Sequence, residues 1–199
     1  MPRLSSIACA VLALAVVLPS VSARVVEQAT SNDAGAVLSH CDADFNLCVF
    51  LSATRVVSGG QPATLLFYSI WDYQNGIYRE GFGTLPRSAL TGTPATGMTL
   101  SADTAVAGFV NETCDLVTGI CTPSAGGIVQ AQWTPTGFFS FRETFSSRFT
   151  IGNVTFRSSG VRSGVSALAS ATLLGLYSFE DVAGNLATNH NTSITIEKP

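Results

Sequence analysis

The chain has 199 residues, of which 46% are hydrophobic and 12% charged, and its formal net charge at pH 7 is -3. A chain of this length can bury a hydrophobic core within a single domain. The mildly acidic balance, without a cluster of lysine and arginine, excludes a polybasic surface for nucleic acid. We therefore expect no nucleic-acid partner.

The N-terminus predicts export from the cytoplasm. A basic residue precedes an apolar run over 7–18, and Val21-Ser22-Ala23 then supplies small residues of the kind that signal peptidase accepts. The run is too short to cross a bilayer, which takes about 20 residues. We predict a signal peptide over 1–23 and one domain over 24–199. The mature protein is expected to be secreted or periplasmic and to lack a transmembrane helix.

Four cysteines remain after this cleavage, in two Cys-x6-Cys pairs that each begin with Cys-Asp. An even number of cysteines in an exported chain indicates disulfides. We expect Cys41 to pair with Cys48 and Cys114 with Cys121, although four cysteines allow three connectivities. A zinc site is not expected, because the spacing is wrong and His40 is the only imidazole nearby.

The segment between the first two cysteines begins like a calcium loop. Asp42, Asp44 and Asn46 place oxygen-bearing side chains at alternate positions. The EF-hand pattern then requires a glycine and a later glutamate, where this chain has Leu47 and Ala53, so an EF-hand is excluded. Two interpretations remain: a looser calcium site, or a turn that Asp and Asn favour. No other cofactor is expected.

Alternating apolar and polar residues predict strands along the rest of the chain. The segment 63–73 is apolar at both parities, which is typical of a central strand covered on both faces. Asn75-Gly76 predicts a tight turn between this strand and the next. A long loop is predicted over 86–97, and 163–176 also admits a helix. The other predicted strands are 45–53, 77–85, 98–102, 106–110, 128–134, 165–179 and 193–197.

Aromatic residues gather around the Asn75-Gly76 turn. Trp71, Tyr73 and Tyr78 flank it, beside hydrogen-bonding side chains. Rings in this setting are suited to stacking on a sugar or to gripping a protein partner. The alternative is that these rings belong to the core, because large aromatic side chains are buried on average. Trp133 is expected in the core.

The clearest period of two lies over 138–161, where a turn at Gly152-Asn153 predicts a hairpin. We expect its aromatic parity to form a buried inner face and the other parity, with Arg142, Arg148 and Arg157, to face solvent. The residues of the aromatic parity are Phe139, Phe141, Phe145, Phe149 and Ile151.

Glu143 shares the phenylalanine parity, so an uninterrupted strand would bury its carboxylate at considerable cost. A β-bulge that turns it outward, or a pair with Arg79 or Arg142, would remove this cost. The third explanation is a cavity in which Glu143 acts as a catalytic acid, with Glu80 or Asp72 as its partner. Glu143 is therefore our candidate catalytic residue.

These patterns predict an all-β fold, an antiparallel meander of about nine or ten strands that forms a β-sandwich or an up-and-down barrel. No Gly-x-Ser-x-Gly motif occurs, and His40 and His190 are the only histidines. We expect a non-catalytic ligand-binding or surface interaction module, with carbohydrate or protein as its partner. The alternatives are a secreted carbohydrate-acting hydrolase that uses carboxylates and a small outer-membrane β-barrel.

Overall fold

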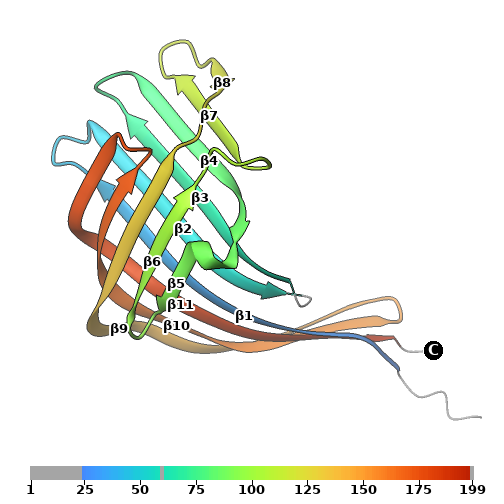
Figure 1. Ribbon diagram of the computed structural model, residues 1–199. Coiled ribbons are helices and arrows are strands. Elements are labelled where there is room, and N and C mark those ends of the chain that lie inside the picture. Colours follow the sequence, from blue (N-terminus) through green and yellow to red (C-terminus); the bar gives the residue numbers. More distant parts are fainter. Residues whose placement is uncertain (1–23, 59–60, 198–199) are drawn as a thin grey trace, which may run out of the picture.

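The structure is a computed structural model that describes residues 24–58 and 61–197. The predicted signal peptide, 1–23, lies outside the described residues. Eleven strands form one antiparallel sheet in the order β5-β6-β9-β10-β11-β1-β2-β3-β4-β7-β8 (Figure 1). The strands are β1 (Arg24–Cys41), β2 (Leu47–Ser58), β3 (Gln61–Asp72), β4 (Ile77–Pro86), β5 (Leu90–Thr93), β6 (Gly97–Asp103), β7 (Val110–Asp115), β8 (Cys121–Pro123), β9 (Ile128–Ile151), β10 (Val154–Leu173) and β11 (Tyr177–Glu197).

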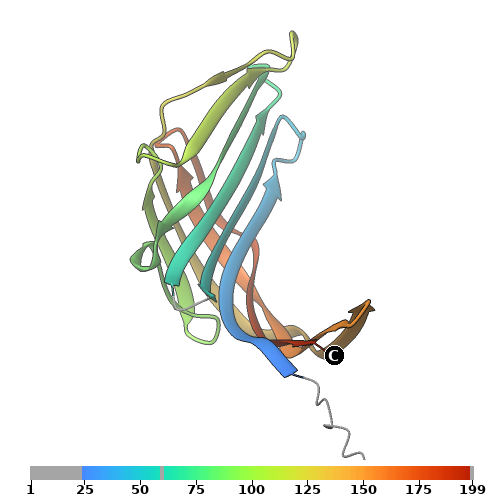
Figure 2. The same ribbon diagram turned by 90° about the vertical axis from the view of Figure 1, so that its right-hand side faces the viewer.

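The predicted all-β antiparallel fold is confirmed. The sheet is single and open, with β5 and β8 at its edges, and it curls so that its two halves face each other (Figures 1 and 2). A 3-10 turn, Arg87–Ala89, carries the chain from β4 to β5 and lies against β3. A hydrogen bond of 3.2 Å from Arg55 Nη2 on β2 to the carbonyl oxygen of Gly92 on β5 joins the facing halves. No helix among the described residues is long and apolar enough to cross a membrane.

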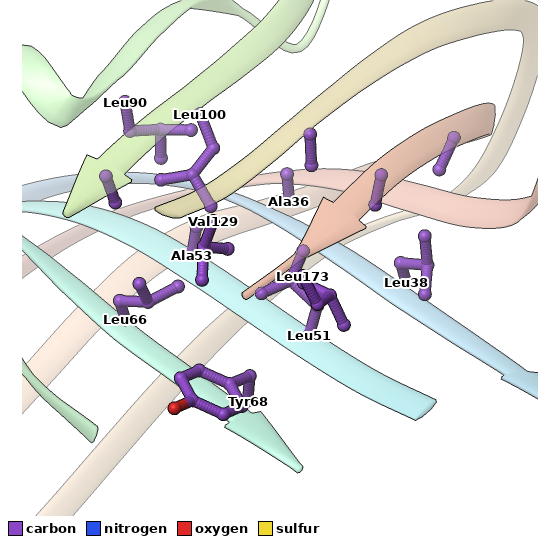
Figure 3. Packing of buried hydrophobic residues seen from close by; sticks show 14 of the residues in the cluster. Ala36, Leu38, Leu51, Ala53, Leu66, Tyr68, Leu90, Leu100, Val129 and Leu173 are labelled. Carbon is purple, nitrogen blue, oxygen red and sulfur yellow. The ribbon is translucent and has the colours of Figure 1, made fainter. Parts of the chain in front are cut away.

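The hydrophobic core fills the inside of this curl, and we call the face that lines it the inner face of the sheet. Side chains from β5, β6 and β9 meet those from β2 and β3 there (Figure 3). Trp133 is fully buried, as predicted, and its indole Nε1 donates to the carbonyl oxygen of Val37 at 3.0 Å. The small residues of β10 that face inward, Ala167, Ala169 and Ala171, leave room for this large ring to pack.

A buried hydrogen-bond chain connects β3 to β7. The Tyr68 hydroxyl donates to Asn111 Oδ1 at 2.7 Å, and Asn111 Nδ2 donates to the carbonyl oxygen of Thr104 at 2.7 Å. The Tyr68 ring lies over Gly81, its cross-strand partner, where a Cβ would come within 2.3 Å of the ring. Glycine is required at that position because the ring occupies the space of a side chain.

Four strands continue beyond the core as an arm, which we define as residues 24–33, 141–151, 154–164 and 189–197. The arm extends from one end of the curled sheet, with the β9–β10 turn at its tip (Figures 1 and 2). None of the buried core residues of the described chain lies in these segments.

The predicted burial of the phenylalanine parity is wrong. Phe141, Phe149 and Ile151 are 46%, 58% and 61% exposed. The cause is a pair of register shifts between β9 and β10, opposite Gly164, Val165 and Ala167, near Gly137 with its positive φ of 84°. A single extra residue in one strand of a pair reverses the face on which all later side chains lie. The shift between Gly164 and Val165 is of this kind, because β9 advances by two residues there while β10 advances by one.

As a result, the two faces of the predicted hairpin are exchanged. Arg157 has the parity of the buried Ala167 and Ala169 on β10, and the pairing of β10 with β11 is continuous between them. Arg148 is its direct partner on β9. The arginines therefore continue the inner face of the sheet, where Arg142, Arg148 and Arg157 are exposed as predicted. Phe141, Phe145 and Phe149 lie on its outer face, and the side chain of Phe139 lies outside the described part of the structure.

Other elements also differ from the sequence prediction. Residues 106–109 form a loop rather than a strand, and β5 lies within the predicted loop 86–97. The strand prediction is confirmed over 163–173, but a turn with Leu174 and Gly175 at positive φ divides the predicted strand 165–179 between β10 and β11. Such a turn joins antiparallel strands in register because its twist matches theirs.

Candidate functional site

The outer face of β1, β2, β3, β4, β7 and β8 carries a row of cross-strand neighbours that begins and ends with a disulfide. Residues directly opposite each other in an antiparallel pair project on the same face. The register places the row across six strands, in the order Cys41, Cys48, Trp71, Tyr78, Cys114 and Cys121. The local disulfide pairing expected from the sequence, Cys41–Cys48 and Cys114–Cys121, is confirmed.

Trp71 and Tyr78 contact each other at the centre of this row. Their ring centroids are 4.9 Å apart and the ring planes are inclined by 43°. The Tyr78 hydroxyl donates to Glu80 Oε2 at 2.6 Å. Burial, this hydrogen bond and the charge of Glu80 raise the pKa of the Tyr78 phenol. Tyr78 thus remains a neutral donor at any physiological pH, and Glu80 is held beside it.

The next row of the same face is charged. Glu80 on β4 and Glu112 on β7 are direct cross-strand partners, and neither forms an ion pair within the described part of the chain. Like charges opposite each other destabilise a strand pair. In the same row, the hydroxyl of Ser69 is fully buried and has no hydrogen-bond partner within the described residues.

The third row is apolar and exposed. Phe67 and Phe82 are direct partners across β3 and β4, and Phe82 pairs in turn with Val110 on β7. These three side chains are 36%, 49% and 38% exposed. A groove of about 430 Å³ opens beside them, lined by Ser52, Thr54, Leu65, Leu66, Phe67, Phe82, Gly83 and Thr84. We call the three rows, together with Phe50 and Leu65, the aromatic face.

The sequence prediction for β3 was therefore half right. Its inner parity, which includes Leu66, Tyr68 and Ile70, is buried, but its outer parity is not covered, since Leu65 is 46% exposed. An apolar run at both parities has two readings: a strand buried on both faces, or a strand with one buried face and one exposed binding face. The sequence alone did not distinguish between them.

Asp72 ends β3 on the opposite, inner face. Burial by itself would raise the pKa of this carboxyl. Hydrogen bonds from the Asn75 side chain and backbone and from the Tyr177 hydroxyl, together with the charge of Arg79, nevertheless hold it below its usual value. The bond from Asn75 Nδ2 is 2.8 Å long and that from Tyr177 is 3.2 Å. Asp72 therefore fastens the β3–β4 turn to β11.

The other predicted site residues are spread over the fold. Tyr73 is 55% exposed in the turn after β3. The Asp42 carboxylate accepts the backbone N–H of Asn46 at 2.7 Å, so it closes the turn between β1 and β2, in which Phe45 has a positive φ of 56°. No group of three His, Cys, Asp or Glu side chains in the described residues is placed to hold a metal ion.

Glu143 lies on the arm, with its side chain 57% exposed and Arg162 Nη1 at 3.9 Å from Oε1. The register shifts in β9 place it on the outer face, as the bulge explanation required, and its partner is Arg162 rather than Arg79 or Arg142. Asp72 and Glu80 lie on or next to β3 and β4, five and six strands further along the sheet. The structure does not bring Glu143 together with either carboxylate.

Comparison of the chain with protein-family models, with curated proteins and with solved structures gave no match.

Proposed function

We propose that this chain is an exported, non-catalytic binding domain and that its aromatic face binds a protein partner. The observation that carries the proposal is the contiguous set of exposed apolar side chains on that face: Leu65, Phe67, Phe82 and Val110. Scattered exposed apolar residues are normal, whereas contiguous patches on soluble proteins mark interaction sites. The predicted export signal and the two disulfides support a location outside the cytoplasm.

The arrangement of the rings favours a protein over a sugar. A sugar ring stacks on a flat aromatic platform, but the planes of Trp71 and Tyr78 are inclined by 43° and their ring centroids are 4.9 Å apart. Phe67 and Phe82 offer apolar surface without a hydroxyl group for hydrogen bonding. Exposed rings beside a groove and bordered by carboxylates have the character of a protein-binding centre, in which aromatic side chains carry most of the affinity.

Site-specific photocrosslinking tests this proposal. Phe82 is replaced by benzoylphenylalanine in the host that secretes the chain, and the culture is irradiated. We expect a covalent adduct of higher mass. The matched control is the same replacement at Leu168, which is 45% exposed on β10, away from the aromatic face. Adducts of equal yield at both positions, or at neither, would contradict the proposal. Specific retention on an oligosaccharide array, lost in Trp71→Ala, would replace the protein partner by a carbohydrate.

A further inference from the structure

The arm carries a basic face whose arginines form no ion pair with any described residue of the chain. On the inner face, Arg148 and Arg157 are direct cross-strand partners, and Arg142 lies on the same face. Within the described residues the only ion pair is that of Arg162 with Glu143, on the other face of the arm. No aspartate or glutamate occupies the inner-face positions of the arm. Two adjacent arginines that no carboxylate neutralises destabilise their own strand pair.

The aromatic face presents the opposite arrangement. Glu80 and Glu112 are also direct cross-strand partners, and both are half-buried; within residues 24–58 and 61–197 neither forms an ion pair. Both pairs span adjacent antiparallel strands, so their side chains have similar spacing, with Cβ atoms about 4.5–5.5 Å apart. An arginine and a carboxylate that meet can form two parallel hydrogen bonds. Contact between the arginine pair and the glutamate pair would therefore remove the like-charge repulsion within each pair.

Apolar side chains adjoin both charged pairs. On the arm, Ile194 is the cross-strand neighbour of Arg157, and Ile196 lies in the next row with Thr155. On the aromatic face, Phe82 and Val110 form the row beside Glu80 and Glu112. Contact between the two surfaces would therefore join charge to opposite charge and apolar surface to apolar surface.

The two surfaces lie on opposite ends of the molecule. The β3–β4 and β7–β8 turns are at the end away from the arm, close to the two glutamates (Figure 1). One chain cannot bring its own arm onto its own aromatic face, because the arm extends from the opposite end of the sheet and the two surfaces lie on opposite faces of the sheet, inner and outer. A second copy can.

We infer that the basic face of the arm, around Arg148 and Arg157, docks on the aromatic face of a second copy of this chain, around Glu80 and Glu112. This inference rests on the proposed function, whose partner it names. The contact is head to tail: each copy offers one arm and one aromatic face. Contacts of this kind continue from copy to copy and generate rings or open chains rather than closed two-fold dimers.

The test measures the mass of the purified mature chain by sedimentation velocity. We expect association that increases with protein concentration at low salt and is lost at about 1 M salt, where the screening length falls to about 3 Å. The arm variant R148S/R157S and the face variant E112K should each weaken association at least about tenfold. The matched control is Arg162→Ser, which removes an arginine from the opposite face of the arm and should leave association unchanged. Circular dichroism confirms that each variant is folded.

Mixing the two defective variants gives the sharpest result. The face variant keeps a native arm, and the arm variant keeps a native face, so the mixture should form dimers with one copy of each and grow no further. A wild-type chain that stays monomeric at every concentration and salt, or a mixture that stays monomeric, would overturn the inference. So would binding of the arm to anionic lipid vesicles in place of self-association. If the purified chain stays monomeric while Phe82 still yields a specific adduct with another protein, this inference fails and the proposed function stands.

Discussion

Removing the Tyr68 hydroxyl should show how much the buried hydrogen bond between β3 and β7, two strands of the aromatic face, stabilises the fold. The Tyr68 hydroxyl is buried and donates to Asn111 Oδ1 at 2.7 Å, and Asn111 lies on β7 next to Glu112. Tyr68→Phe keeps the ring over Gly81 but leaves the buried amide oxygen without a donor. An unsatisfied buried acceptor costs about 1–3 kcal/mol, so we expect the free energy of unfolding to fall by that amount.

Urea denaturation followed by intrinsic fluorescence measures this loss as a lower midpoint with an unchanged slope. The matched control is Tyr73→Phe, which removes the same atom from a side chain that is 55% exposed and should change the free energy by less than about 0.5 kcal/mol. Combining Tyr68→Phe with Asn111→Ala should cost less than the sum of the two changes, because both remove one interaction. Equal losses in the two tyrosine variants, or additive losses in the double variant, would refute the reasoning.

Two further predictions concern the ends of the strands. The pKa of Asp72 is lowered in the folded protein, so this carboxylate stabilises the fold at pH values above its ordinary pKa near 4, and the contribution is lost as the pH falls through the lowered pKa. Asp72→Asn should therefore flatten the acid limb of a plot of stability against pH, and an unchanged limb would contradict this. Replacing Cys114 and Cys121 by serine removes a disulfide with a sequence separation of 7 and should lower the free energy of unfolding by about 2–3 kcal/mol. Thermal unfolding measures this loss, and a change below about 0.5 kcal/mol would show that the disulfide does not constrain the unfolded chain.

Local sequence signals were sufficient for much of the fold. Asn75-Gly76 marked the β3–β4 turn, and Gly76 has the positive φ of 66° that the turn needs. The two Cys-x6-Cys pairs indicated their own partners, because a separation of 7 residues fits a hairpin end. The parity of Phe141 and Phe149 against Arg148 was also read correctly. In each case the controlling interaction lies within a few residues of the pattern that predicts it.

The direction in which a face points was not predictable in the same way. Parity says which side chains lie together, but which side they occupy depends on every register shift along the strand. The shifts opposite Gly164, Val165 and Ala167 were not visible in the sequence, and they exchanged the two faces of β9 in the arm. The contact between Glu80 and Glu112 was missed because 31 residues lie between them in the sequence. Their contact depends on the register of β4 against β7, which the sequence does not reveal. Only the pairing of β4 with β7 brings them together.

The distribution of surface types argues that the aromatic face has a role other than folding. Its apolar side chains Leu65, Phe67, Phe82 and Val110 are exposed, so they contribute little to the stability of one chain. The opposition of Glu80 and Glu112 subtracts from that stability. The core on the inner face is complete without them. A disulfide nevertheless crosslinks the strands at each end of the Trp71–Tyr78 row, which restrains the neighbouring backbone. A rigid surface that costs stability in isolation is favourable only in contact with another molecule, where preorganisation reduces the entropy lost on binding.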